Sequence, residues 1–237
     1  MAQRYTSRPL HYSLKGITIF AGLSANALAR IQRRCSWRRY EQGEPIVNYR
    51  DSSDEVFFIT AGEAHVTIYS HDGKVVSFGE LGAGEVFGEY AAIDHGLRSA
   101  SVEARTDCLV ASMPAPAFRA LLETHPTVTL ALLTQLVKRA RTVTRRVYEF
   151  STLHVDHRVQ AEVLRLATLA GRQGKSARIV PAPTHAEIAS RVSTHREAVT
   201  RVLNHLSRIG LVTRSGDALL VSDVERLAQM VQDAVRE

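Results

Sequence analysis

Glu89, Arg98 and Ser99 are side chains that together could hold a ribose joined to a phosphate. An ionised Glu89 only accepts hydrogen bonds, so it suits a sugar hydroxyl and repels a phosphate. Arg98 offers a planar fork of N–H donors to phosphate oxygens, and the Ser99 hydroxyl adds one more. Gly88 lets the backbone turn close to a ligand, and a helical turn over Tyr90–Ile93 would point free amides at an anion. From spacing alone, a surface loop with an ordinary Glu–Arg pair is the alternative.

A second group of polar residues lies near residue 200. The spacing predicts a helix from about Thr194 to Ile209, with Val199, Leu203 and Leu206 on one side and polar residues on the other. Arginine can read guanine O6 and N7 in the major groove of DNA, and glutamate can accept from a cytosine amine. The alternative is a solvated charged face on a winged three-helix domain. The predicted DNA contacts are Thr184, His185, Thr194, His195, Arg196, Glu197, Thr200 and Arg201.

Short apolar segments cut by glycines and polar turns extend from about Ser36 to Met113. Strands that recur every eight to twelve residues favour an antiparallel barrel or sandwich. A helix with Ser24 as its cap precedes them, over Leu23–Cys35. The predicted strands include Val56–Ile59, Ala64–Tyr69, Val75–Phe78 and Cys108–Met113, with a hairpin turn at His71–Lys74.

A long helix is predicted next, over Thr127–His154, because Pro126 suits a helix start. At about 1.5 Å per residue it would be roughly 42 Å long. Its apolar residues follow alternating spacings of three and four, which is typical of a helix that pairs with a partner. A core helix within one domain is the alternative. The predicted stripe is Leu133, Leu136, Ala140, Val143, Val147, Phe150 and His154.

The remainder of the chain is predicted to form short helices and a small hairpin. Thr184 and Glu187 have the spacing of a capping box at the start of a helix. The predicted elements are helices over Arg158–Ala170, Thr184–Val192 and Asp223–Val235, and strands over Leu211–Thr213 and Ala218–Val221.

Net charge is +6, from 30 basic and 24 acidic residues, and 26 of the basic residues are arginine. Residues 157–237 hold 12 basic and 8 acidic side chains, so they carry +4 of that excess. The distribution favours a polyanionic partner for this part of the chain, although a GC-rich genome would give the same arginine bias. Two cysteines, Cys35 and Cys108, cannot make a disulfide framework, and no apolar run is long enough to span a membrane. We therefore expect a cytoplasmic protein that does not bind a membrane.

Phe87-Gly88-Glu89, followed by Arg98-Ser99-Ala100, resembles the phosphate-binding cassette of cyclic-nucleotide-binding domains. The resemblance implies that Glu89 binds the ribose 2′-hydroxyl and that Arg98 and Ser99 bind the cyclic phosphate. It also implies backbone contacts from Gly88 and Ala100. Tyr90 departs from the family, which has an aliphatic residue after the glutamate.

Residues 184–203 closely resemble the helix-turn-helix of the CRP/FNR transcription regulators, including the Arg-Glu-x-x-x-Arg pattern of the cAMP-receptor branch. The resemblance covers the chain from about residue 20, and the residues before that are not assigned. It implies an α+β chain with a β-roll domain (1–125), a dimerisation helix (126–155) and a winged helix-turn-helix domain (156–237). The implied partners are cAMP or cGMP, a second copy of the chain through residues 127–154, a palindromic DNA operator and RNA polymerase. We expect no metal or haem.

Alignment with the family places Val143 and Thr144 where base-contacting hydroxyls occur. Val143 cannot form a hydrogen bond, so Thr144 and then Thr142 are the predicted contacts to the base. A hydroxyl can donate or accept, and Ser99 could help a guanine in the syn conformation, so cAMP and cGMP are both expected to bind. Two alternative functions are a regulator that has lost ligand control and an enzyme acting on cyclic nucleotides.

Overall fold

The protein is described by a computed structural model over residues 12–69 and 75–236. The predicted turn at His71–Lys74 lies outside the described residues. The chain forms two compact units, each with its own core. Unit 1 comprises residues 1–69 and 78–138, and unit 2 comprises residues 70–77 and 139–237, so the boundary divides one long helix.

Unit 1 is built on two four-stranded sheets, which confirms the predicted β-roll. In the first sheet the order is β1-β8-β3-β6, and in the second it is β2-β7-β4-β5. Strand β3 reads as a continuous apolar run because both of its faces are buried. The strands are β1 (Ser36–Tyr40), β2 (Pro45–Val47), β3 (Val56–Ala61), β4 (Glu63–Tyr69), β5 (Val75–Gly82), β6 (Val86–Phe87), β7 (Ser101–Ala104) and β8 (Cys108–Met113).

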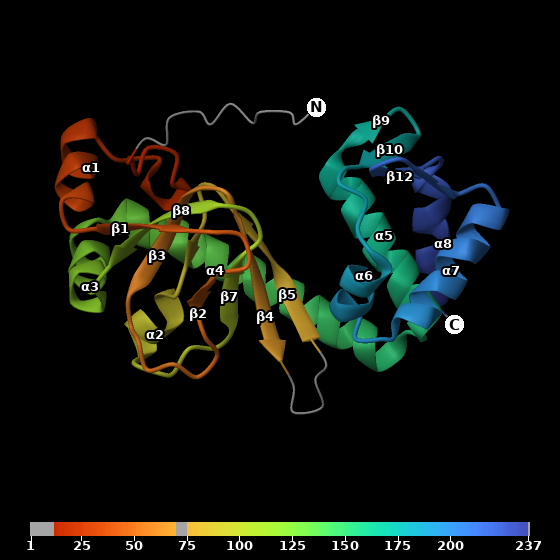
Figure 1. Cartoon of the computed structure of the whole chain (residues 1–237), viewed down its shortest axis with the longest axis horizontal. Coiled ribbons are helices and arrows are strands. Elements are labelled where there is room, and N and C mark those ends of the chain that lie inside the picture. Colours follow the sequence, from red (N-terminus) through yellow and green to blue (C-terminus); the bar gives the residue numbers. More distant parts are fainter. Residues whose placement is uncertain (1–11, 70–74, 237) are drawn as a thin grey trace. The chain divides into compact units, whose positions relative to one another are not determined.

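Alternate residues of β3 join two different hydrophobic clusters. Phe57 and Ile59 pack with residues from both sheets, in the core between them. Val56 and Phe58 instead pack with residues from the helices of unit 1. Figure 1 shows α1 and α3 beside β1. These helical elements are η1 (Thr18–Phe20), α1 (Ala25–Gln32), α2 (Glu89–Asp94), α3 (Ala115–Thr124) and the first part of α4 (Pro126–Thr152).

Helix α1 begins as predicted, because the Ser24 hydroxyl accepts a hydrogen bond from the Ala27 amide at 3.3 Å. Helix α4 also confirms the predicted long helix to within two residues at its C-terminal end. The predicted apolar stripe needs two corrections. His154 is not part of α4, which ends at Thr152, but is the N-cap of the next helix. The second correction concerns Leu136. Leu136 packs against the helix-covered core of unit 1, whereas the neighbouring Val137 is 52% exposed.

The burial of Leu136 follows from helix geometry. Val128 and Leu132 are fully buried on the inner face of α4, and a residue four positions further lies on the same face. Leu136 therefore continues the buried face. The exposed apolar residues of α4, which we call the outer stripe, are Leu130, Leu133, Val137, Val143, Val147, Tyr148 and Phe150.

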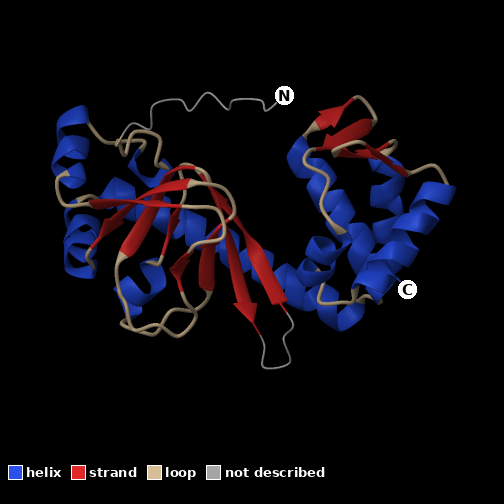
Figure 2. Ribbon diagram, viewed as in Figure 1, coloured by secondary structure: helices blue, strands red, loops and turns tan. Residues whose placement is uncertain are grey.

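Unit 2 confirms the predicted winged helix-turn-helix, with a four-stranded sheet in the order β11-β12-β10-β9 beside four helices (Figure 2). Strands β9 and β10 were not predicted. Residues from these four helices and from β10, β11 and β12 form one core. The elements are α5 (Val155–Ala170), β9 (Arg172–Gln173), β10 (Ser176–Ile179), α6 (His185–Arg191), α7 (Arg196–Arg208), β11 (Val212–Ser215), β12 (Ala218–Val221) and α8 (Val224–Arg236).

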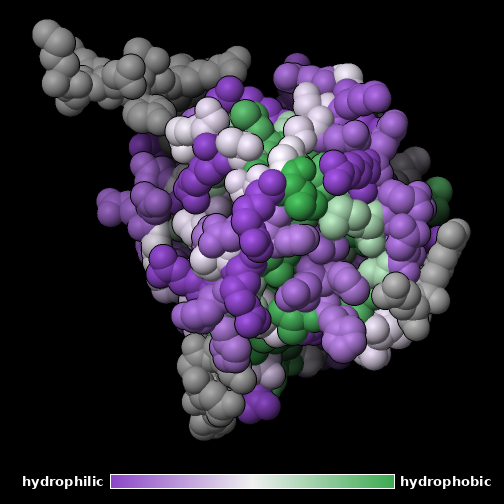
Figure 3. All heavy atoms as spheres, turned by 90° about the vertical axis from the view of Figure 1, so that its right-hand side faces the viewer, coloured by the Kyte–Doolittle hydropathy of each residue, from purple (hydrophilic) through white to green (hydrophobic). Residues whose placement is uncertain are grey.

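The surface drawn in Figure 3 is dominated by hydrophilic residues, with smaller hydrophobic patches between them. None of the helices in the described part of the chain combines the length and the apolarity that a membrane crossing needs.

Candidate ligand-binding site and nucleic-acid interface

Gly88 forms the turn between β6 and the short helix α2. Its φ is 81°, in the left-handed region that favours glycine. A Cβ at this position would lie 2.7 Å from Nη1 of Arg98 and 2.8 Å from the carbonyl oxygen of Glu55. Both the backbone conformation and the close approach of Arg98 therefore require a residue without a side chain.

The guanidinium of Arg98 is held from three sides by protein acceptors. Nε donates to the Ser53 hydroxyl at 3.0 Å, Nη1 to the Gly88 carbonyl at 2.9 Å and Nη2 to the Glu55 carbonyl at 2.8 Å. The same group lies 5.4 Å from the ring centroid of Phe57. These contacts fix one orientation for a residue that is only 3% exposed.

Charge around Arg98 favours its ionised form. Burial lowers the pKa of Arg98, and the carboxylates of Glu55, Asp54, Asp51 and Glu89 oppose that shift. Glu89, the first residue of α2, is itself 1% exposed. A buried acidic side chain and a buried basic side chain thus contribute to one site, and a buried charge is stable only when it has partners.

The remaining predicted cassette residues lie close to this pair in the chain. Tyr90 is 43% exposed on α2. Ser99 is exposed and Ala100 is half-buried, directly after Arg98 and before β7. Ser53 was missed by sequence reasoning because it lies in the polar run 51–55, which has no periodicity or motif to set it apart.

Thr142 and Thr144, the predicted base contacts, belong to α4 within unit 2, whereas Glu89 and Arg98 belong to unit 1. The Thr144 hydroxyl donates to the Ala140 carbonyl at 3.0 Å. Its one proton is therefore used within the helix, and its oxygen is left to accept. A contact between these threonines and a nucleotide remains a prediction.

The capping box at the start of α6 is confirmed. The Thr184 hydroxyl accepts from the Glu187 amide at 3.2 Å, and the Glu187 carboxylate accepts from the Thr184 amide at 2.6 Å. This arrangement satisfies two backbone amides and fixes where α6 begins.

Helix α7 separates an apolar face from a polar face, as predicted. Val199, Leu203 and Leu206 are buried. The helix begins at Arg196, not at Thr194, because His195 has an extended backbone and is the N-cap. Thr194 and His195 therefore lie in the turn between the two helices. On the polar face, Arg196, Glu197 and Arg201 are exposed and Thr200 is half-buried.

Two of the predicted DNA contacts meet each other. Nδ1 of His185, the first residue of α6, lies 2.7 Å from the Thr200 hydroxyl on α7. Burial and the charges of Arg196 and Arg214 lower the pKa of His185. Sequence reasoning named His185 and Thr200 but did not pair them, because residues fifteen positions apart on two helices share no periodicity.

Arg191, at the end of α6, contacts α5. Its Nη1 lies 3.2 Å from Glu162, and Arg165 forms two further hydrogen bonds with the same carboxylate, at 2.6 and 2.7 Å. Burial acts to raise the pKa of Glu162, but Arg165 and Arg191 hold it below its usual value. This buried cluster joins α5 to the helix-turn-helix.

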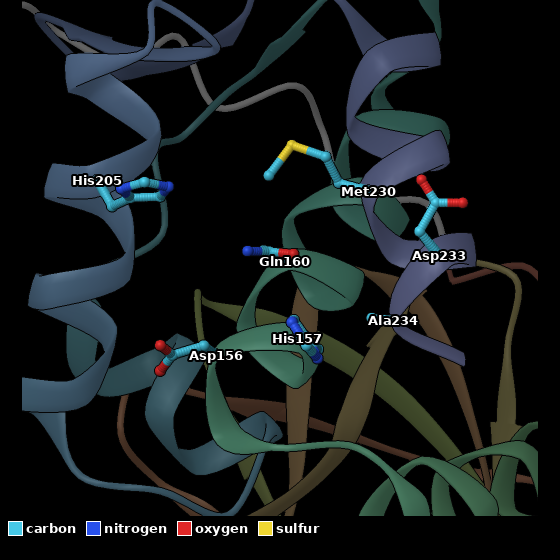
Figure 4. A pocket seen from close by; sticks show the side chains of 7 residues that line it. All are labelled: Asp156, His157, Gln160, His205, Met230, Asp233 and Ala234. Carbon is cyan, nitrogen blue, oxygen red and sulfur yellow. The ribbon is translucent and has the colours of Figure 1, made fainter. Parts of the chain in front are cut away.

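A separate pocket of about 500 Å³ lies between α5, α7 and α8 (Figure 4). His205 projects from α7, whereas Met230 and Asp233 come from α8. No predicted ligand or DNA contact lines it. Its residues are Asp156, His157, Gln160, His205, Met230, Asp233 and Ala234. Among the described residues, no three His, Cys, Asp or Glu side chains are grouped so that they could hold a metal ion.

Comparison with known proteins covers both units. Residues 37–125 match the cyclic nucleotide-binding domain family, and residues 157–230 match the Crp-like helix-turn-helix domain family. The chain is 31% identical to the cAMP-activated global transcriptional regulator Vfr of Pseudomonas aeruginosa, over 82% of this chain and 92% of that protein. It is 27% identical to the CRP-like cAMP-activated global transcriptional regulator of Mycobacterium tuberculosis, over 89% and 95%.

The fold has a counterpart in a solved structure. That protein is the c-di-GMP-responsive global regulator CLP of Xanthomonas campestris, with a TM-score of 0.72 and 23% identity over 84% of this chain and 99% of that chain. The two family matches, the relative at 31% identity and the shared fold agree with the residues described above. The chain belongs to the CRP/FNR superfamily of transcription regulators, in the branch that resembles the cAMP receptor protein.

Proposed function

We propose that the protein is a homodimeric transcription regulator whose affinity for DNA is set by a cyclic nucleotide bound in the β-roll. The observation that carries the proposal is the buried Glu89 and Arg98 beside the left-handed turn at Gly88. Two buried, oppositely charged side chains suit the two ends of a ribose cyclic phosphate. We propose no enzymatic activity, and the relatives are named as transcriptional regulators.

Arg98 can bind a phosphate without losing its protein contacts. A guanidinium has five N–H donors, and three of them are used by Ser53, Gly88 and Glu55. Within the described residues, these bonds leave one N–H on each Nη without an acceptor. Two cyclic phosphate oxygens would take these donors, Ser99 would add a hydroxyl, and Glu89 would accept from the ribose 2′-hydroxyl.

The base would meet the hydroxyl of Thr144, with Thr142 as the second contact. Because the Thr144 proton is donated to Ala140, the oxygen suits an amine donor such as adenine N6. We propose cAMP as the main ligand on this ground. We keep cGMP as a second ligand through Ser99.

The outer stripe of α4 supports a dimer of the chain. Leu130, Leu133, Val137, Val143 and Val147 are each at least 50% exposed. Apolar residues on one side of so long a helix are stable in water when a partner helix covers them. A second copy of the same helix supplies a complementary stripe by symmetry.

The polar face of α7 would enter the major groove of DNA. Arg196 and Arg201 could contact guanine, Glu197 could accept from cytosine, and Thr184 would lie by the phosphates. In a dimer, two such helices would read half-sites about 34 Å apart, or one turn of DNA. The protein would act in the cytoplasm at a palindromic operator, in contact with RNA polymerase.

A ligand that bridges the β-roll and α4 would favour one arrangement of the two DNA-binding domains. Its effect on DNA affinity cannot exceed its differential affinity for the two arrangements. One feature favours a second candidate, a regulator without ligand control. The Arg98 guanidinium has three acceptors from the protein itself, so its buried charge does not depend on a nucleotide for its partners.

Titration calorimetry with cAMP and with cGMP separates the two candidates. We expect binding of at least one nucleotide to the wild-type protein, and at least about a hundredfold loss of affinity in Arg98→Gln, since two charge-assisted hydrogen bonds are removed. Arg105→Gln, on the neighbouring strand connection and paired with Glu80, is the matched control and should bind normally. No binding of either nucleotide to the wild type would leave the ligand-independent regulator.

A further inference from the structure

His185 and Thr200 form a polar contact between the two helices of the helix-turn-helix. Nδ1 of His185 lies 2.7 Å from Oγ1 of Thr200, and the same Oγ1 lies 3.0 Å from the carbonyl oxygen of Arg196. The contact connects the first residue of α6 to the second turn of α7. It therefore ties the start of one helix to the polar face of the other.

One arrangement of protons satisfies both contacts as hydrogen bonds. Thr200 has one hydroxyl proton, and a carbonyl oxygen can only accept. If the hydroxyl donates to Arg196, then Nδ1 of His185 must carry a proton and donate to Thr200. In the neutral ring, Nε2 then has a lone pair and no hydrogen. Only the imidazolium form offers an Nε2–H to a further acceptor.

Positive charges close to His185 oppose this second proton in the free protein. These charges are Arg196 on α7 and Arg214 on β11. Together with burial, these two charges lower the pKa of His185. Burial and the two charges thus favour the neutral ring before DNA binds. On its own helix, Glu187 is engaged in the capping box with Thr184.

DNA would reverse the balance of charge at this point. Phosphates next to Arg196 and Arg214 would compensate both guanidinium groups, and a phosphate oxygen would accept from Nε2–H. We propose that His185 orients the recognition helix α7 through Thr200, and that the binding of DNA takes up a proton on His185. This inference rests on the proposed DNA-binding function.

The sign of the pH dependence follows from linkage. If the complex holds more protons than the free protein, a fall in pH favours the complex. One proton taken up gives at most about a tenfold change in affinity per pH unit, between the free and the bound pKa of the group. Affinity should therefore rise as pH falls below 7, and the effect should be absent at pH 8.

Variants of His185 and Thr200 separate the positioning of α7 from proton uptake by His185. In His185→Asn the amide nitrogen can take the place of Nδ1–H and donate to Thr200, but it does not titrate. Its affinity for DNA should therefore depend less on pH than that of the wild type, which is the readout for proton uptake. In Thr200→Val the contact is lost, so affinity should fall by about fivefold at every pH, and Thr200→Ser should restore it.

The experiment uses the full chain with saturating cAMP and a labelled 40-base-pair duplex selected from a random library with the wild-type protein. Fluorescence anisotropy gives the Kd between pH 5.5 and 8. His205→Asn, an exposed histidine further along α7, is the control for the other histidines. Between pH 7.5 and pH 6.0 the affinity of His185→Asn for DNA serves as the reference. Over the same range we expect the affinity of the wild type and of His205→Asn to rise about five times more than that of His185→Asn.

Equal pH slopes in the wild type and His185→Asn would overturn proton uptake while leaving the DNA-binding function intact. Failure of the wild type to select or bind any duplex between pH 5.5 and 8 would overturn the proposed function and this inference with it. Normal affinity of Thr200→Val at every pH would overturn the positioning role.

Discussion

Arg98 donates from Nη1 to the carbonyl oxygen of Gly88 at 2.9 Å, and a Cβ on Gly88 would lie 2.7 Å from that same nitrogen. The turn and the guanidinium therefore occupy adjoining space, and neither can change without moving the other. Glu89 follows the turn directly and begins α2. The conformation of one glycine thus fixes the positions of both charged side chains of the candidate ligand site.

Gly88→Ala should abolish nucleotide binding, because the new methyl group displaces the Arg98 guanidinium. The left-handed backbone should also cost about 1–2 kcal/mol of stability. Gly43→Ala is a matched control, since φ is 84° at Gly43 and nothing lies within 4 Å of its Cβ position. Calorimetry with cAMP and thermal unfolding should show a similar loss of stability in both variants but a loss of binding only in Gly88→Ala. Normal cAMP affinity in Gly88→Ala would refute this role.

Thr144→Val should weaken cAMP binding by about 0.5–1.5 kcal/mol, since the hydroxyl oxygen would no longer accept from the base. The effect on cGMP should be smaller, because guanine O6 needs a donor and the Thr144 proton is committed to Ala140. Thr134→Val removes the same kind of hydrogen bond within α4, from Thr134 to Leu130, and should leave both affinities unchanged. Calorimetry with the two nucleotides measures the difference, and equal losses for both would contradict the proposed contact.

Val137→Glu should weaken the proposed dimer by about a hundredfold or more, because a charge in an apolar helix interface is not compensated. Val137 is on the outer stripe and makes little contact with the core of its own chain. Leu169→Glu, at a 72% exposed position outside the outer stripe, is the control. Sedimentation velocity over a concentration series gives the monomer–dimer equilibrium. With a dimer Kd of about 1 µM, the wild-type protein would be almost entirely dimeric at about 100 µM. A wild-type protein that stays monomeric at that concentration would rule out this dimer.

Glu162→Gln should destabilise unit 2 by about 3–5 kcal/mol, because the buried ion pair between Arg191 and Glu162 is lost while the guanidinium stays buried. The pKa of Glu162 is lowered in the folded protein. The stability that it contributes is therefore present above the unfolded value of about 4.3 and is lost as the pH falls through the folded pKa. The exposed pair of Glu225 with Arg172 supplies the control variant Glu225→Gln. Thermal unfolding between pH 7 and pH 3 should show a reduced acid dependence only in Glu162→Gln, and an unchanged melting temperature there would contradict the role of this cluster.

The sequence predicted the elements whose periodicity is strong and local. The long helix, the caps at Ser24 and Thr184 and the amphipathic α7 depend on neighbouring residues, and each was found at or within two residues of its expected place. Helix α3 was missed because Pro114 and Pro116, at its N-terminal end, interrupt the helical pattern of the sequence. Strands β9 and β10 were missed because they are only two and four residues long.

Contacts between distant residues could not be predicted in the same way. The acceptors of Arg98 include two backbone carbonyls, at Gly88 and Glu55, which have no side-chain signature. Leu136 fits a heptad pattern as well as Val137 does, and only the packing of α4 on unit 1 distinguishes them. Arg214, whose charge lowers the pKa of His185, comes from a strand whose sequence carries no motif.

Control of this regulator by a cyclic nucleotide requires that its affinity for DNA change when the nucleotide binds. The measurement is the Kd of the full-length protein for a duplex selected from a random library, by fluorescence anisotropy at pH 7.5, with no nucleotide, with cAMP and with cGMP. We expect binding at least about tenfold tighter with cAMP, which corresponds to a coupling free energy of about 1.4 kcal/mol, and no such change in Arg98→Gln. Equal affinity under all three conditions would contradict a regulator controlled by a cyclic nucleotide.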